Sequence, residues 1–136
     1  MTNMRKHLLD PWIDAADIAQ CISAPETLLV VVIGAQAWCQ KCRDFYPAFC
    51  RHAEQAQGQY VYCWLDMEEH QEFLGRFVPE NLPWLCVYQG QQILASYAIK
   101  ADDLAAQIEL VLQQGISDVE EPGIFARLVK TDWAID

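Results

Sequence analysis

Two cysteines lie two residues apart in the segment Trp38-Cys39-Gln40-Lys41-Cys42. On a helix, residues three apart share one side, so the two sulfur atoms can meet there. The pair could close a reversible disulfide, or supply two of the four ligands of a zinc ion. Both residues could also be small buried side chains without chemistry. The residues around the pair decide among these three interpretations.

The sequence on either side of the pair favours a redox dithiol. An apolar, β-branched run at residues 28–33 is typical of a buried strand, and a helical pattern begins near Cys39. Free amide groups and the helix dipole stabilise a thiolate at the amino end of a helix. There the pKa of a cysteine can fall from about 8.5 to roughly 3.5–7.5, and Lys41 would favour the thiolate further. We expect Cys39 to be the exposed nucleophile and Cys42 the buried resolving thiol.

A metal site is disfavoured by the positions of the other candidate ligands. Cys50 and His52 lie about two helical turns beyond Cys42, too far to share one ion easily. We therefore expect no metal ion and no organic cofactor. His70 has no partner pattern and is expected to be a solvated residue. The cysteines outside the pair are expected to fill the core as small apolar residues; they are Cys21, Cys50, Cys63 and Cys86.

The rest of the chain alternates strand and helix patterns. Strands separated by helices pair in parallel, and a hairpin with a Gln89-Gly90 turn adds antiparallel strands. This order predicts an α/β fold, with a mixed central sheet flanked by helices on both faces. Strands are expected at residues 28–33, 60–66, 84–88 and 93–99, and helices over residues 12–22, from Cys39 to Gly58, after Glu68, and from Asp102 to Gly115.

With these elements in place, the sequence resembles the thioredoxin family. The segment at 38–42 matches the family's W-C-x-x-C motif, and Pro47 matches its helix-kinking proline. Leu82-Pro83, just before a strand, matches the position of its cis-proline. The resemblance covers about residues 12–114 and implies a thioredoxin-like fold. It also implies that Pro83 is cis beside Cys39, and that Trp38, Leu82 and Pro83 form an apolar site for peptide substrates.

Several positions depart from the family pattern. Typical members carry a buried acid where this chain has Ile33, and often a lysine where it has Trp64. Because the acid and the lysine are both absent, neither is left as an unpaired buried charge. Without the acid to take up its proton, however, Cys42 would be harder to deprotonate. We therefore expect slow disulfide reduction, and an Ile33→Asp variant is predicted to raise turnover. Gln40 and Lys41 replace the usual Gly-Pro between the cysteines and are expected to modulate the redox potential.

Composition excludes several classes of partner. The 136 residues suit one domain, and 9 basic against 19 acidic residues give a net charge of −10, which argues against nucleic acid and anionic membranes. The longest apolar run, residues 28–35, is too short to span a bilayer. The first residues lack the pattern of a signal peptide, so a cytoplasmic protein without standing disulfides is expected.

These features predict a thioredoxin-like domain at residues 1–115 and an extension at 116–136. The apolar stripe of the extension either packs on the domain or serves as a docking or dimerisation helix. The chain is predicted to be a protein-disulfide oxidoreductase in cell redox homeostasis, with protein disulfide substrates and an upstream thiol reductase as partners. The alternative is a non-enzymatic adaptor or assembly chaperone, which the missing polar pair and the extension favour.

Overall fold

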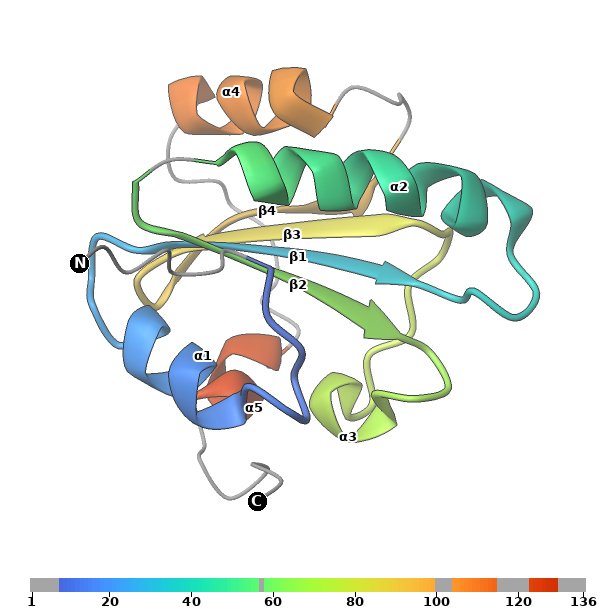
Figure 1. Cartoon of the computed structure of the whole chain (residues 1–136), viewed down its shortest axis with the longest axis horizontal. Helices are drawn as coiled ribbons and strands as arrows, with labels where there is room; N and C mark the ends of the chain where they lie inside the picture. Colours follow the sequence, from blue (N-terminus) through green and yellow to red (C-terminus); the bar gives the residue numbers. More distant parts are fainter. Residues whose placement is uncertain (1–7, 57, 100–103, 115–122, 130–136) are drawn as a thin grey trace.

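The computed structural model of the chain describes residues 8–56, 58–99, 104–114 and 123–129. Within these ranges a four-stranded sheet in the order β2-β1-β3-β4 runs through the middle of the molecule, with helices on both sides (Figure 1). The strands are β1 (Leu28–Gly34), β2 (Tyr60–Asp66), β3 (Trp84–Gln89) and β4 (Gln92–Ala98). The helices are α1 (Ala15–Ile22), α2 (Gln40–Gln55), α3 (Gln71–Leu74), α4 (Leu104–Gln114) and α5 (Ile124–Leu128).

The sheet is mixed, as the order of elements predicts. β1 pairs in parallel with β2 and antiparallel with β3, and β3 and β4 form an antiparallel hairpin. Every residue of β1 is buried, because neighbouring strands cover both its edges and helices cover both faces. This position explains why the sequence of β1 is apolar throughout instead of alternating.

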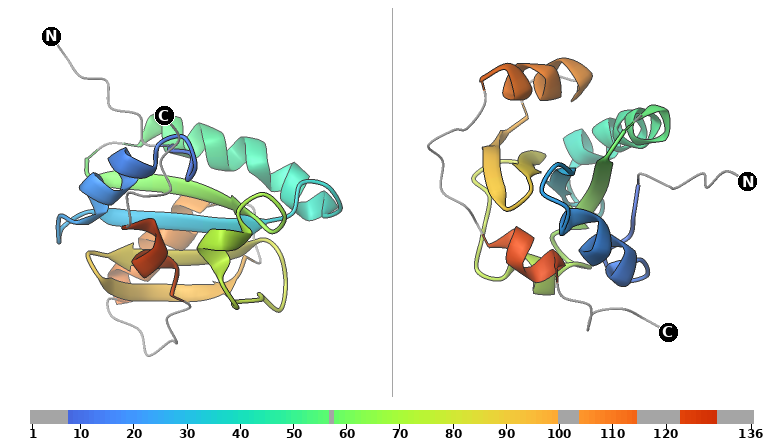
Figure 2. Two further views of the ribbon diagram at one scale, coloured as in Figure 1. Left: turned by 90° about the horizontal axis from the view of Figure 1, so that it is seen from below. Right: turned by 90° about the vertical axis from the view of Figure 1, so that its left-hand side faces the viewer.

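The helices form two layers. α2 and α4 lie on one face of the sheet, and α1, α3 and α5 lie on the other (Figures 1 and 2). Because successive side chains of a strand point to opposite faces, β1 feeds two separate cores. Val30 and Val32 pack in the core under α2 and α4, which we call the α2-side core. Val31 and Ile33 pack in the opposite one, the α1-side core.

α1 begins later than the sequence pattern indicates. Oδ1 of Asp10 accepts hydrogen bonds from the amides of Trp12 at 2.9 Å and Ile13 at 3.1 Å, which holds these residues in a turn. The helix therefore starts at Ala15, and its buried residues are Ala15, Ile18, Ala19 and Ile22.

α3 is also shorter than expected. Oδ1 of Asp66 accepts from the amides of Glu68 and Glu69, so both residues form a turn that precedes the helix. α2 ends at Gln55 instead of Gly58, and Pro47 lies inside it as predicted. The predicted boundaries of the last long helix, Asp102 and Gly115, lie outside the described residues.

α5 belongs to the 116–136 extension and packs on the domain. Its apolar side chains Ile124, Phe125 and Leu128 are buried in the α1-side core, beside α1 and α3. The ring of Phe125 lies 5.6 Å from that of Tyr88 in β3. These three side chains are thus occupied within the chain itself. The boundary between domain and extension stays a prediction.

Candidate active site

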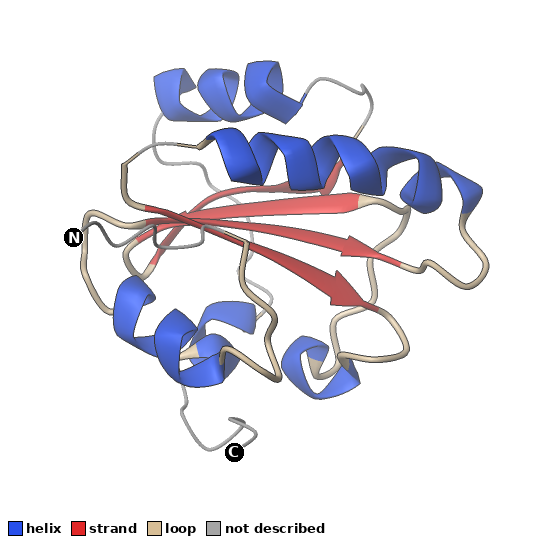
Figure 3. Cartoon of the chain, in the orientation of Figure 1, coloured by secondary structure: helices blue, strands red, loops and turns tan. Residues whose placement is uncertain are grey.

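The cysteine pair lies at the amino end of α2, next to the carboxyl ends of β1 and β2 (Figure 3). Cys39 and Cys42 are joined by a disulfide, with their Cα atoms 5.2 Å apart. Cys39 is the N-cap of α2, and its Sγ accepts a hydrogen bond from the amide of Cys42 at 3.2 Å. Cys39 is half-buried and Cys42 is fully buried. A thiolate on Cys39 would face the free amides and the positive end of the helix dipole.

The loop before Cys39 is held by hydrogen bonds from α2 on one side and from the end of β2 on the other. The Arg43 guanidinium donates to the backbone oxygen of Gln36 at 2.7 Å and to Oε1 of Gln40 at 2.8 Å. Gln40 in turn donates to Asp44 at 2.7 Å. On the other side, the amide of Gln36 donates to Oδ2 of Asp66 at 3.0 Å. These contacts hold the backbone before Cys39 in place. They also fix the Gln40 side chain between Arg43 and Asp44 on the surface of α2.

The residues expected to bind substrate differ in their exposure. The peptide bond between Leu82 and Pro83 is cis, as the family resemblance predicts. Pro83 is buried, and its backbone oxygen accepts a hydrogen bond from the amide of Ile99 at 2.9 Å. Leu82 and Cys39 both pack at the border of the α2-side core, and Trp38 is 60% exposed. The other motif residue, Lys41, is exposed.

Ile33 does not lie beside the disulfide. It pairs with Leu65 of β2 and is buried in the α1-side core, whereas Cys42 belongs to the α2-side core. Trp64 belongs to the α2-side core as well, so Ile33 and Trp64 lie on opposite faces of the sheet. They do not replace a neighbouring polar pair. A carboxylate at Ile33 would be separated from Cys42 by the sheet itself, because adjacent residues of a strand alternate faces.

Gly34 and Trp64 occupy the position next to Cys42. A Cβ atom on Gly34 would lie 3.2 Å from Sγ of Cys42, and it would also contact Cζ2 and Cη2 of the Trp64 indole. The indole therefore fills the space that a side chain at Gly34 would need. Its ring packs edge-to-face with Tyr46 at 4.9 Å and Phe49 at 5.7 Å. Trp64 is 7% exposed, and its Nε1 has no hydrogen-bond partner among the described residues.

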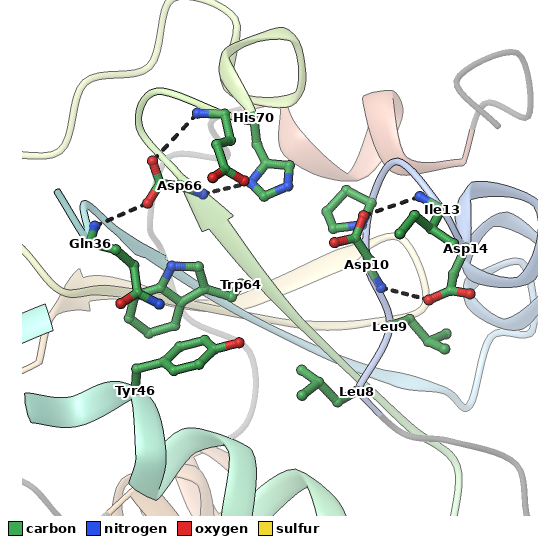
Figure 4. Close-up of a pocket in the computed structure, with 12 residues that line it drawn as sticks. Leu8, Leu9, Asp10, Ile13, Asp14, Gln36, Tyr46, Trp64, Asp66 and His70 are labelled. Atoms are coloured by element: carbon green, nitrogen blue, oxygen red, sulfur yellow. Dashed lines mark hydrogen bonds between the residues drawn. The ribbon is translucent and has the colours of Figure 1, made fainter. Parts of the chain in front are cut away.

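A pocket of about 580 Å³ lies on the other side of Trp64 (Figure 4). His70 lines it and is buried, so the expectation of a solvated histidine is wrong. Nδ1 of His70 accepts a hydrogen bond from the amide of Asp66 at 2.8 Å, and burial lowers the pKa of its ring despite the carboxylates nearby. Other lining residues are Asp10, Asp14, Tyr46, Trp64 and Asp66.

Comparison with known families agrees with this geometry. A family model described as thioredoxin matches residues 13–110. The chain belongs to the thioredoxin family. No match was found among curated protein sequences. Within the described residues, no helix is long and apolar enough to cross a membrane, and no group of three or more histidine, cysteine or acidic side chains could hold a metal ion.

Solved thioredoxin structures share the fold at low sequence identity. The short form of thioredoxin f from spinach chloroplast is 13% identical, with a TM-score of 0.59 over 83% of this chain and 97% of that one. Thioredoxin from Schistosoma mansoni is 16% identical, with a TM-score of 0.61 over 82% and 97%. A mutant thioredoxin from Halobacterium salinarum is 16% identical, with a TM-score of 0.60 over 83% and 95%. At this identity the likeness shows the fold alone.

Sequence reasoning missed that Trp64 and Cys42 both lie over Gly34. It interprets Trp64 only as a substituted lysine and gives Gly34 no role. The alternation within residues 60–66 does predict that Trp64 shares a face with Tyr62. Which residue of β1 lies beside it depends on the strand register, which pairs Trp64 with Val32 and Asp66 with Gly34.

Proposed function

We propose that this thioredoxin-family protein is a thiol-disulfide oxidoreductase that acts on protein disulfides through Cys39 and Cys42. The observation that carries the proposal is the disulfide at the amino end of α2, with one sulfur near the surface and the other buried. This asymmetry suits a two-step exchange, in which Cys39 attacks first and Cys42 resolves the mixed disulfide.

The surroundings of Cys39 support protein substrates. Trp38 is exposed beside it, and Leu82 with the cis Pro83 borders the same core. We propose that these three residues bind the peptide around a substrate disulfide, and that Gln40 and Lys41 tune the redox potential. An upstream thiol reductase or a small thiol would supply the electrons. A cytoplasmic location and a role in redox homeostasis belong to the same proposal.

The test is reduction of insulin with a thiol donor, compared between the wild-type protein and Cys39→Ser. The variant is expected to fall to the uncatalysed rate, because the nucleophile of the first step is lost. Cys21→Ser is a matched control that removes a cysteine outside the motif, and it should keep the wild-type rate. Equal rates for wild type and Cys39→Ser would contradict the proposed enzyme activity.

The same assay distinguishes the proposed enzyme from the alternative function. A non-enzymatic adaptor or assembly chaperone would show no catalysed insulin reduction with or without Cys39. One observation favours this rival: the Trp64 indole, which has no ionisable group, lies over Gly34 together with the sulfur of Cys42, where typical relatives were expected to carry a lysine in place of Trp64. An adaptor would still bind its partner when both motif cysteines are replaced by serine.

A further inference from the structure

The second step of the proposed reaction takes place in apolar surroundings. Cys42 is fully buried, and the buried side chains of its core come from all four strands and from α2 and α4. Among the described residues, Asp66 and His70 are the buried side chains with a carboxylate or an imidazole, and both line the 580 Å³ pocket. The titratable groups that pack in the core around Cys42, apart from the cysteines, are phenols. Burial raises the pKa of Tyr46 to about 12, and it also raises the pKa of Tyr62 and Tyr97, so these phenols are neutral near pH 7.

Trp64 separates this core from the acidic pocket. Its indole reaches the space over Gly34 where Sγ of Cys42 lies, and the same residue lines the pocket. Cys42 itself does not line the pocket. In Figure 4, Trp64 and Tyr46 lie together on one side of the pocket, opposite Asp10 and Asp14. The indole thus has the buried sulfur on one side and the pocket on the other.

A candidate for a base on this face of the sheet is Asp66, two residues after Trp64 along β2. Among the described residues it is the one buried carboxylate. Its Oδ2 accepts from the amide of Gln36, and its Oδ1 accepts from the amides of Glu68 and Glu69. Both oxygens are therefore engaged by backbone amides of the loops at this end of β2.

We propose that Trp64 is a positioning residue that shields Cys42 from water and from the acidic pocket, which makes closure of the Cys39–Cys42 disulfide the slow step of exchange. This inference rests on the proposed function. Its consequence is a long-lived mixed disulfide between Cys39 and the substrate, so that the protein holds a partner covalently for longer than it takes to capture it.

Atoms and electrons balance over the two steps. The Cys39 thiolate attacks the substrate disulfide, a bond forms between Cys39 and one substrate sulfur, and the other substrate thiolate leaves. Cys42 then gives its proton to solvent and attacks Sγ of Cys39, which expels the second substrate thiolate. Two protein thiols are oxidised and one substrate disulfide is reduced. An apolar surrounding disfavours the thiolate needed for the second attack and leaves the first attack unchanged.

The experiment follows both steps with dithiobis-nitrobenzoate as the disulfide. Reduced protein is mixed with a substoichiometric amount, quenched in acid at successive times, and analysed by mass spectrometry for the adduct on the Cys39 peptide. In the wild type the adduct should accumulate, and its rate of loss should keep rising up to a pH above about 8.5, the ordinary pKa of a cysteine. Cys42→Ser should form the adduct and keep it.

The decisive variants are Trp64→Gln and Trp64→Phe. Trp64→Gln admits water beside Cys42, which should lower the pKa of its thiol. A decrease of about two pKa units raises the thiolate fraction about a hundredfold, while the nucleophilicity of that thiolate falls about tenfold. Adduct loss near pH 7 should then be about tenfold faster, with a lower pH midpoint. Trp64→Phe keeps an apolar ring without the indole N–H and should stay close to wild type. Adduct formation should be equal in all three proteins.

Each other outcome overturns one specific statement. Unchanged adduct loss in a folded Trp64→Gln protein, or a Trp64→Phe protein as fast as Trp64→Gln, would refute the shielding role. If Trp64→Gln does not fold, a wild-type pH midpoint at or below about 8.5 would refute it instead. Absence of any Cys39 adduct would refute the proposed function itself, which keeps the two failures distinct.

Discussion

At the scale of single residues, the site depends on which face of β1 each side chain occupies. Ile33 and Gly34 are neighbours in sequence, yet only Gly34 lies against Cys42. The family resemblance selects Ile33 by its distance from Cys39. In the structure, Gly34 and Trp64 are the residues of β1 and β2 that lie next to the sulfur of Cys42. The reason is that successive residues of a strand point to opposite faces of the sheet, so the sequence distance from Cys39 does not determine which residue lies there.

Replacing Ile33 by aspartate is therefore expected to destabilise the protein without raising turnover. The side chain is 0% exposed in an apolar core, where a carboxylate finds no partner and costs several kcal/mol. Urea unfolding and insulin reduction measure the two effects. Ile13→Asp is the matched control, because Ile13 is 68% exposed and its change should stay within about 0.5 kcal/mol. Faster turnover at unchanged stability would contradict the assignment of Ile33 to the far face.

At the scale of elements, α5 completes the α1-side core. The sequence pattern leaves two roles open for its apolar stripe, packing or docking. In the structure the stripe is buried beside α1 and α3, and the Arg127 guanidinium lies over Gly75 at the end of α3. Gly75 has a φ of 61°, in the left-handed region, and this backbone conformation favours glycine at the position.

Truncating Leu128 in α5 is expected to destabilise the whole domain. Leu128 is 2% exposed in the core, and Leu→Ala changes at such sites cost about 2–5 kcal/mol. Equilibrium unfolding in urea measures the loss. Ala126→Ser, on the exposed side of the same helix, should have little effect. Equal stability of Leu128→Ala and Ala126→Ser would show that α5 does not contribute to the core in solution.

At the scale of the whole molecule, the stability should depend on pH through His70. This ring joins the end of β2 to the amino-terminal turn, where it stacks on Trp12 at 6.5 Å and accepts from the amide of Asp66. A neutral ring is required to accept that hydrogen bond. Burial lowers the pKa of His70 below its unfolded value, so the unfolded chain binds the proton more readily.

The free energy of unfolding is therefore expected to fall as the pH is lowered from about 7 to about 5, through the unfolded pKa of histidine. Urea unfolding across this range measures the slope. His70→Asn offers an oxygen in place of Nδ1 and does not titrate, so its slope should be smaller. An undiminished slope in His70→Asn would contradict this origin of the pH dependence.

Much of this molecule could be predicted from local patterns. The apolar runs of β1 and β2 reflect the burial of these strands, and the turn signal at Gly90 marks the hairpin, so the sequence predicts the mixed sheet. The starts of α1 and α3 could not be predicted in the same way. They depend on the carboxylates of Asp10 and Asp66, which hold turns through hydrogen bonds to nearby amides.

The sequence by itself determined the cysteine pair: one helical turn between Cys39 and Cys42, at the junction of a strand and a helix, is a local property of the chain. Only the tertiary structure decided what surrounds the buried sulfur. Gly34 and Trp64 meet Cys42 through the parallel pairing of β1 with β2, in which Asp66 lies opposite Gly34. That register arises from packing between segments about thirty residues apart, and no local spacing encodes it.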